Sequence, residues 1–128
     1  MLWLVQVALD TQLYNNIIYD GKTVPVYDSI PDQSTLPYIR FGEDTVSPWD
    51  TKTTYGKDMT HTLHVFSDQG WNQEVKEIMR LIEVQLRNPI TIDGHKVVIA
   101  ELEFQEVFEE ENNIKHGAMR FRFRIQED

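Results

Sequence analysis

Two segments near the C-terminal end carry the clearest structural signal of the chain: VIAELEFQ at residues 98–105 and MRFRFRI at residues 119–125. In both, apolar residues alternate with charged or polar residues, which is the pattern of a β-strand with one face on a hydrophobic core. A polar turn near residues 110–113 separates them. Together they predict an antiparallel hairpin over residues 97–108 and 114–125.

A single register satisfies both faces of this hairpin. If paired positions have numbers that sum to 223, apolar residues meet apolar residues and glutamates meet arginines. A shift by one residue would spoil both faces. The expected pairs are Leu102 with Phe121, Phe104 with Met119, Glu101 with Arg122, and Glu103 with Arg120. We interpret the arginine stripe as paired within the chain, and the alternative is a row that binds phosphate.

Two other segments show helical periodicity, with apolar residues every three or four positions. The first spans residues 2–14 and presents Leu2, Val5, Leu9 and Leu13. The second spans about residues 71–87 and presents Val75, Ile78, Met79, Ile82 and Leu86. Asn88-Pro89 ends it, because the residue before a proline avoids helical angles. Trp71, at the start of the second helix, is expected to be a packing residue.

The region that follows the first helix carries turn signals. Asp20-Gly21, between the short runs Ile17–Tyr19 and Lys22–Val24, predicts a two-residue hairpin. The segment Val24–Tyr27 is expected to be an edge strand, because Pro25 has no backbone N–H to donate to a neighbouring strand.

The segments Tyr38–Glu43 and Met59–Ser67 are the next expected strands, and they should pair antiparallel. Between them lies the polar stretch Asp44–Asp58, which we interpret as a long mobile loop. It lacks paired acids, a nucleophile and ligand spacing, so it is expected to be a contact arm. Trp49 is either an exposed anchor for a partner or a residue that folds back on its own sheet. The candidate interface residues are Asp44, Thr45, Val46, Trp49, Asp50, Thr51, Lys52, Thr53 and Tyr55.

Five short motifs are PYIRFGED (37–44), WDTKT (49–53), TLHVFS (62–67), EVKEIM (74–79) and HGAMRFRF (116–123). Together they resemble a family of phage, prophage and gene-transfer-agent proteins described as tail-completion, tail-terminator or tail-to-head joining proteins. The resemblance covers roughly residues 24–124. Family members often open with an alanine-rich helix that leads directly into a strand, whereas Asp20-Gly21 interrupts that region here.

Composition limits the class of protein. A length of 128 residues favours a single domain over residues 1–128, which the resemblance implies is tail-terminator-like, and 41% hydrophobic content is typical of a globular protein. The chain has no cysteine, which excludes disulfides and thiolate metal sites. A net charge of −9 disfavours binding to a nucleic-acid backbone. The apolar start lacks the basic segment of a signal peptide, and no apolar run is long enough to cross a membrane.

The sequence presents no catalytic or metal-binding constellation. A zinc site needs three or four convergent ligands, and His61 and His64 are expected to point to opposite faces of one strand. We interpret these two residues, with His95 and His116, as half-buried residues of the sheet. The run Glu109–Glu111 is a candidate cation site or, more simply, a solvated turn. We therefore expect no enzymatic activity, no metal and no cofactor.

These patterns predict an α+β fold, with an antiparallel or mixed β-sheet, two helices packed on one face and a long inter-strand loop. The resemblance implies a non-enzymatic virion assembly protein that caps the tail tube and helps to join tail to head, as a ring usually of six copies. It implies as partners other copies of the chain, the tail tube protein, and a head–tail connector or head-closure protein. DNA would pass through the lumen, without membrane or sequence-specific nucleic-acid binding. The expected location is the virion, and the host cytoplasm during assembly.

Two alternatives remain open. The chain could be a head-closure, neck or tail-tube structural protein, because these share small α+β bodies with long loops. From a different class, it could be a small hydrolase or ligand-binding domain. A deep pocket with perturbed carboxylates would favour the second alternative.

Overall fold

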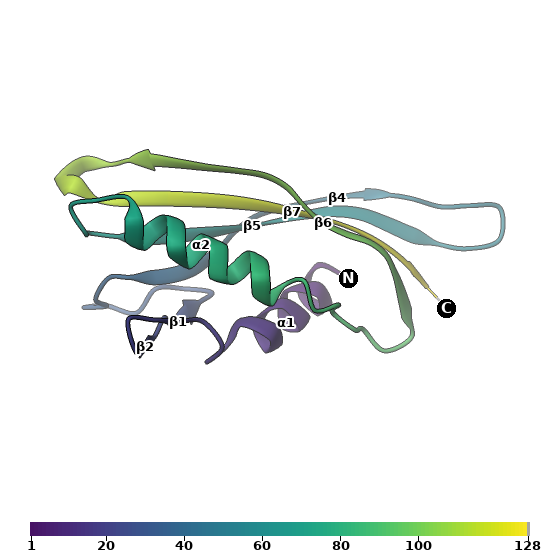
Figure 1. The fold of residues 1–128 in the computed structure, drawn as a ribbon. Helices are drawn as coiled ribbons and strands as arrows, with labels where there is room; N and C mark the ends of the chain where they lie inside the picture. The colour runs from purple at the N-terminus through teal and green to yellow at the C-terminus, as the bar shows by residue number, and fades with distance from the viewer. Residues whose placement is uncertain (128) are drawn as a thin grey trace.

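A five-stranded sheet with both helices on one face forms the molecule, so the predicted α+β class is confirmed (Figure 1). The computed structural model describes residues 1–127. The helices are α1 (Leu2–Leu13) and α2 (Gln73–Gln85), and a short 3-10 turn spans Glu111–Asn113. The strands are β1 (Ile18–Tyr19), β2 (Lys22–Thr23), β3 (Val26–Tyr27), β4 (Tyr38–Pro48), β5 (Gly56–Ser67), β6 (His95–Glu109) and β7 (Lys115–Glu127). The order in the main sheet is β3-β4-β5-β7-β6, and β1 and β2 form a separate hairpin.

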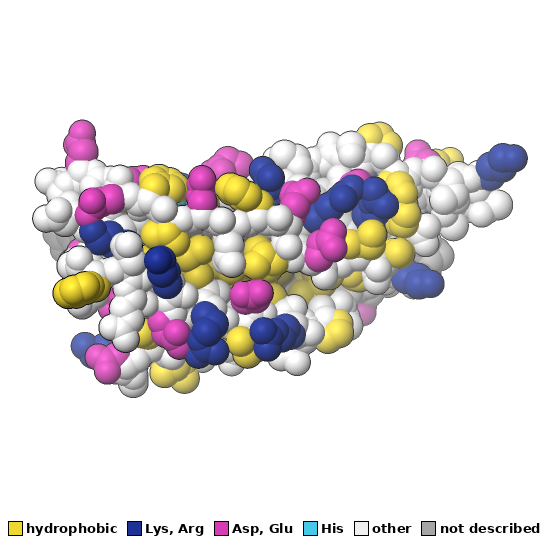
Figure 2. Space-filling view, turned by 45° about the horizontal axis from the view of Figure 1, so that its top comes forward, with side chains coloured by type: hydrophobic (Ala, Val, Ile, Leu, Met, Phe, Trp, Pro, Cys, Tyr) yellow, Lys and Arg dark blue, Asp and Glu magenta, His cyan; other side chains and the backbone are white. Residues whose placement is uncertain are grey.

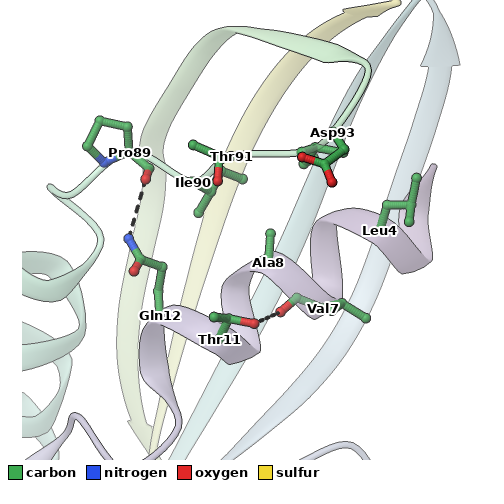
Figure 3. Close-up of a pocket in the computed structure, with 10 residues that line it drawn as sticks. Leu4, Val7, Ala8, Thr11, Gln12, Pro89, Ile90, Thr91 and Asp93 are labelled. Atoms are coloured by element: carbon green, nitrogen blue, oxygen red, sulfur yellow. Dashed lines mark hydrogen bonds between the residues drawn. The ribbon is translucent and has the colours of Figure 1, made fainter.

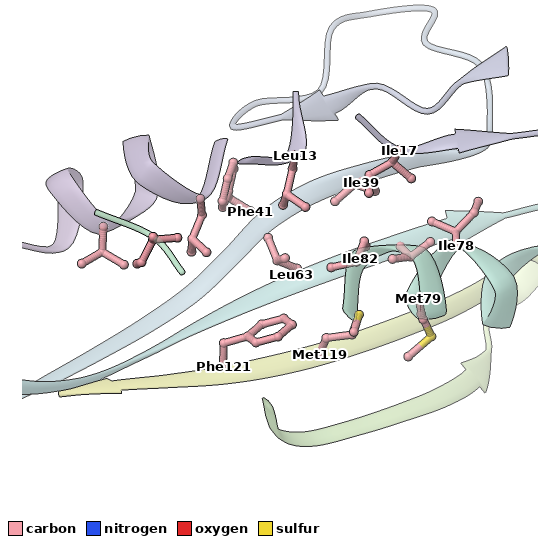
Figure 4. Packing of buried hydrophobic residues seen from close by; sticks show 14 of the residues in the cluster. Leu13, Ile17, Ile39, Phe41, Leu63, Ile78, Met79, Ile82, Met119 and Phe121 are labelled. Carbon is pink, nitrogen blue, oxygen red and sulfur yellow. The ribbon is translucent and has the colours of Figure 1, made fainter. Parts of the chain in front are cut away.

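The hydrophobic core lies between the two helices and the inner face of the sheet (Figure 4). Each helix contributes one apolar stripe, as the periodicity predicts. The buried helical residues are Val5, Leu9, Leu13, Val75, Ile78, Met79 and Ile82. The buried residues that the sheet contributes to this core are Ile39, Leu63, Val65, Met119, Phe121, Phe123 and Ile125. Burial of such side chains, at about 1.5–3 kcal/mol each, is the main force that holds helices and sheet together.

The β6–β7 hairpin has the predicted topology and, at its centre, the predicted register. Leu102 lies opposite Phe121, and Glu101 lies opposite Arg122. The helix-facing residues of β7 are all buried, so the alternation in this strand is confirmed. Strands β5 and β7 then pair along twelve residues each without a bulge, and they form the centre of the sheet.

Beyond Leu102 the register of β6 differs from the prediction. A bulge places Phe104 opposite Arg120 rather than opposite Met119, because one extra residue in a strand exchanges the two faces. The Phe104 ring is therefore 45% exposed, and the Arg120 guanidinium lies 5.2 Å from its centroid. Glu103 still makes the expected ion pair, since its carboxylate accepts from Arg120 Nε at 2.8 Å.

The N-terminal third has the predicted elements. The Asp20-Gly21 turn joins β1 and β2, and β3 is an edge strand of the main sheet, parallel to β4.

The prediction that Trp71 is a packing residue is wrong, because its side chain is 83% exposed just before α2 begins. Among residues 1–127, neither helix has the length and apolar character needed to cross a bilayer.

Candidate assembly interface

The candidate interface residues lie on an arm formed by the end of β4, the start of β5 and the turn between them, and β7 pairs along the β5 side of this arm. Strand β4 continues to Pro48 and β5 begins at Gly56, so only residues 49–55 remain as a turn. The arm extends beyond both helices (Figure 1). The prediction of a long loop without regular structure is therefore wrong. Strands that do not cover a hydrophobic core do not need alternating apolar residues, so the arm has no periodic signal.

The arm leaves the body at a bulge between Phe41 and Asp44. Within it, a Cβ on Gly42 would lie 2.3 Å from Cδ2 of His64, so the close approach requires glycine. Asp44 lies opposite the fully buried His61, with 2.9 Å between Oδ1 and Nδ1. Burial lowers the pKa of His61 and raises the pKa of Asp44. Both shifts favour the neutral form of the group over its charged form, because burial of His61 and partial burial of the Asp44 side chain remove water from the charges.

Polar contacts across three strands stiffen the base of the arm. The hydroxyl groups of Thr45 and Thr60 lie 2.6 Å apart. Asp58 accepts two hydrogen bonds from Arg122, at 3.0 and 2.8 Å, and one from Arg124 at 3.2 Å. The hydrogen bonds from Arg122 hold the pKa of Asp58 below its usual range. The arginines are thus paired within the chain, as interpreted from the sequence, but these two pair with an acid on β5 instead of β6.

Trp49 folds back on the arm, which is the second of the two alternatives for this residue. Its side chain is half-buried, and the Arg124 guanidinium lies 5.3 Å from the ring centroid. The Trp49 N–H donates to the carbonyl of Gly56 at 2.9 Å. A Cβ on Gly56 would lie 2.5 Å from the Trp49 carbonyl oxygen, so this crossing also requires glycine.

The turn of the arm is closed by its own hydrogen bonds. The Asp50 carboxylate accepts from the Gly56 N–H at 3.1 Å, and the Thr51 hydroxyl accepts from the Thr54 N–H at 3.0 Å. These contacts use the side chains of two predicted interface residues to shape the turn. They leave those side chains less available to a partner.

Three other predicted interface residues are exposed at the tip of the arm. Tyr55 is 70% exposed while its carbonyl accepts from the Glu127 N–H at 3.0 Å, and Lys52 is exposed without an ion pair among residues 1–127. Thr53 is also exposed. The tapered end of the molecule in Figure 2 carries a basic side chain. The tip therefore presents an aromatic ring and an ammonium group on an anchored backbone.

A histidine pair on the helix-free face of the sheet was missed by the sequence analysis. Nδ1 of His64 lies 2.6 Å from Nε2 of His116, and each outer ring nitrogen meets a carboxylate. His64 Nε2 lies 2.8 Å from Glu43, and His116 Nδ1 lies 2.6 Å from Glu110. The contact with His64 lowers the pKa of Glu43. The signal that could have found the pair is the β5–β7 register, because it sets His116 opposite Phe66 and thus beside His64.

This histidine pair is not arranged as a metal centre. The four groups lie in a line, and every ring nitrogen faces a different neighbour, so three donors do not converge on one point. Within residues 1–127 no three such groups meet in a way that could hold a metal ion. The run Glu109–Glu111, predicted to be a solvated turn, makes contacts within the chain. Glu110 contacts His116, and Glu109 pairs with Lys115.

Two hollows on the described surface are open to solvent, and their lining residues do not form a catalytic arrangement. The hollow between α1 and residues 89–93 has a volume of about 430 Å³, and a more polar one near β2 and β3 has about 450 Å³. Neither lining sets a nucleophile beside a histidine base. These two hollows therefore give the hydrolase alternative no support.

Comparison with known proteins identifies a family. The model of a family described as "Tail completion protein gp17" matches residues 15–126. A relative of the same description from Bacillus phage SPP1 is 25% identical over 101 residues, which are 78% of this chain and 75% of that protein.

Two solved structures share the fold. A chain from the virion of a native gene transfer agent particle superposes with a TM-score of 0.80 at 18% identity, over 95% of this chain and 94% of that chain. The structure of the bacteriophage SPP1 gp17 protein superposes with a TM-score of 0.61 at 22% identity, over 96% of this chain and 91% of that chain. At these identities the likeness shows a common fold.

Proposed function

The chain belongs to the Tail completion protein gp17 family, and we propose from this premise that it caps the tail tube and helps to join tail to head. The family match over residues 15–126 is the observation that carries the proposal. Membership assigns the chain a structural role in assembly of a phage or gene-transfer-agent particle. The tube-capping and head-joining steps are the finer part of the proposal.

The arm is the surface proposed to make these contacts. It projects beyond the helices, and a projecting hairpin can reach a second molecule without disturbing the core of its own. In the described structure Lys52, Thr53, Tyr55 and Val46 are exposed on it and available to a partner. Asp44, Thr45, Trp49, Asp50 and Thr51 contribute by holding its shape.

A ring, proposed to contain six copies, fits the layout of the sheet. A closed ring needs two different surfaces on each subunit that complement one another. Beyond the two residues that β3 covers, the outer edge of β4 has no strand partner within residues 1–127, and the outer edge of β6 has none either. Exposed strand edges are sites where another chain can add hydrogen bonds. The two edges differ in sequence, so contacts between copies would be head-to-tail.

The proposed partners are other copies of the chain, the tail tube protein, and a head–tail connector or head-closure protein, within one domain that spans residues 1–128. The proposed location is the virion, reached from the host cytoplasm during assembly. A net charge of −9 per subunit would repel DNA phosphates, so DNA would pass a lumen lined by such subunits without adhering. The role requires no catalysis.

The proposal is tested by shortening the arm. Residues 49–56 are replaced by the dipeptide Asn-Gly, which makes a two-residue turn between the paired Pro48 and Lys57. Electron microscopy of particles made with this variant should reveal overlong tails or tails without heads, while capsids fill with DNA. The control is Trp71→Ala, which removes an exposed tryptophan of the body that lies outside the arm.

Two outcomes would contradict different parts of the proposal. Normal tails and normal joining with the shortened arm, in a protein that is folded and present in the particles, would remove the role of the arm. Normal particles without the protein at all would remove the tail-capping function itself.

A further inference from the structure

The outward face of α1 is apolar although nothing in the described structure covers it. Its inner face packs on the core through Val5, Leu9 and Leu13. On the outer face, Trp3 is 64% exposed, and Leu4 and Val7 are also exposed. Exposed apolar groups that gather on one helix face usually mark a surface that another molecule covers.

A hollow flanks this face on each side. One, of about 430 Å³, lies between α1 and the segment that follows α2, with Leu4, Val7 and Ala8 on its helical wall (Figure 3). The other, of about 310 Å³, lies between α1 and the start of the sheet. Val7 lines both, so the outer face is a ridge between two grooves.

The second hollow combines aromatic rings with carboxylates. Trp3, Tyr14, Asp10 and Asp28 are among its lining residues, and no lysine or arginine is. Burial raises the pKa of Asp10, because its carboxylate loses water without gaining a cation. Asp28 accepts one hydrogen bond from Gln6 at 2.8 Å and forms no ion pair in the described structure.

A basic side chain on an apolar stem complements such a hollow. Its ammonium group would meet the two carboxylates, and its methylene groups and charge would lie on the faces of the aromatic rings. The tip of the arm carries this chemistry, with the exposed Lys52 near the exposed ring of Tyr55. The arm points away from the body, so the tip cannot turn back to the α1 of its own chain (Figure 1).

We propose that the outer face of α1 receives the arm tip of a neighbouring copy, with Lys52 in the hollow beside Asp10 and Asp28 and Tyr55 on the apolar ridge. The inference rests on the proposed ring and adds a second contact between neighbouring copies to the strand-edge contact. The contact joins one end of a subunit to the middle of the next. It is therefore head-to-tail, the kind of contact that forms a ring when the rotation between neighbouring copies closes.

A charge exchange tests the contact. Lys52→Glu and Asp28→Lys, each introduced alone in a strain that lacks the gene, should reduce the yield of complete tailed particles by at least about tenfold, because each places like charges together. The two substitutions combined should restore most of the yield. The matched control is Lys76→Glu on α2, which changes the net charge equally at another exposed lysine and should have no effect.

A second measurement locates the contact directly. A zero-length carbodiimide cross-linker applied to intact particles should join Lys52 to Asp28 or Asp10, and Lys52→Arg should abolish the product. Single variants with normal yield, a double variant as defective as the singles, or cross-links from Lys52 only to other proteins would overturn the inference. These results would leave the proposed function intact, whereas complete particles in the strain without the gene would remove the proposed function first.

Discussion

The two long hairpins of the sheet are built on different principles. In the β6–β7 hairpin, β7 has one face on the core, and its buried residues alternate with arginines along the strand. In the outer half of the β4–β5 hairpin no helix lies beneath the strands, and the pairing depends on polar contacts such as Thr45 with Thr60. Both are antiparallel ladders interrupted by bulges. The difference teaches that alternation in a sequence reports burial of one face, and strands without a covered face do not show it.

The largest expected effect is a difference in stability loss between substitutions on the two faces of the β6–β7 hairpin. Phe121→Ala should lower the free energy of unfolding by about 3–5 kcal/mol, because it opens a cavity in the core. Phe104→Ala, on the opposite strand, should cost about 1 kcal/mol or less, because that ring is 45% exposed and lies under the Arg120 guanidinium. Chemical denaturation of both variants measures the two values. Equal losses would mean that the bulge after Leu102 does not turn Phe104 outward.

A smaller effect tests whether the arm is a ladder. Gly56→Ala places a Cβ against the backbone of Trp49 and should cost about 1–3 kcal/mol, because backbone atoms cannot move aside easily. Gly117→Ala should cost less, since the new Cβ meets only the flexible side chain of Met79.

Amide hydrogen exchange shows which part of the protein is destabilised by Gly56→Ala. In the unmodified protein the N–H groups of Trp49 and Gly56 should be protected, because both are hydrogen-bonded. In Gly56→Ala they should exchange faster, while amides of β7 opposite β6 keep their protection. Rapid amide exchange in the arm of the unmodified protein would contradict the ladder and support the mobile loop predicted from the sequence.

The smallest effect is a dependence on pH that differs between body and arm. His61 is buried with its pKa lowered, so below pH about 6.5 the unfolded chain binds a proton that the folded chain refuses. The free energy of unfolding should therefore fall as pH drops below that value, by at most about 1.4 kcal/mol per pH unit for this one group. Asp44 faces His61 across the pair of strands, and Glu43 and Asp28 lie near Asp44.

The arm should resist the same acidification. The lowered pKa of Asp58 keeps its carboxylate charged, so its contribution is present above the ordinary aspartate range and is lost only as pH falls through the lowered value. Urea unfolding at pH 7.5, 6.5 and 5.5 measures the slope, and His61→Phe should flatten it. An unchanged slope in His61→Phe would assign the effect to other groups, and a slope that flattens in Asp58→Asn would assign it to the arm.

Much of the body could be predicted from the sequence because one physical signal, burial, governs it. The stripes that contain Val5 and Ile78, and the alternation around Phe121, report which side chains leave water. The register at Leu102 followed from the same signal. The bulge after Leu102 could not be predicted, because an extra residue in one strand leaves the local pattern of each segment plausible.

The candidate site was harder to predict for two reasons. Trp49 and Tyr55 are both aromatic residues in a polar setting, and only the course of the turn decides that the first packs on Arg124 while the second is exposed. The meeting of His64 with His116 depends on β5 and β7 being neighbours in the sheet. Nothing local to either residue carries that information.

The unbroken pairing of β5 with β7 allows the arm to transmit force along the sheet. Twelve consecutive residue pairs join the tip, at Gly56, to the end of β5 at Ser67, with no bulge at which the two strands could flex. A load applied at the tip is therefore carried along both strands as shear, and many hydrogen bonds must yield together before the strands slip. Bending is left to the bulged outer strands β4 and β6. A push on the arm by a docked neighbour would arrive at the opposite end of the sheet, beside the histidine pair, as a twist of the whole subunit.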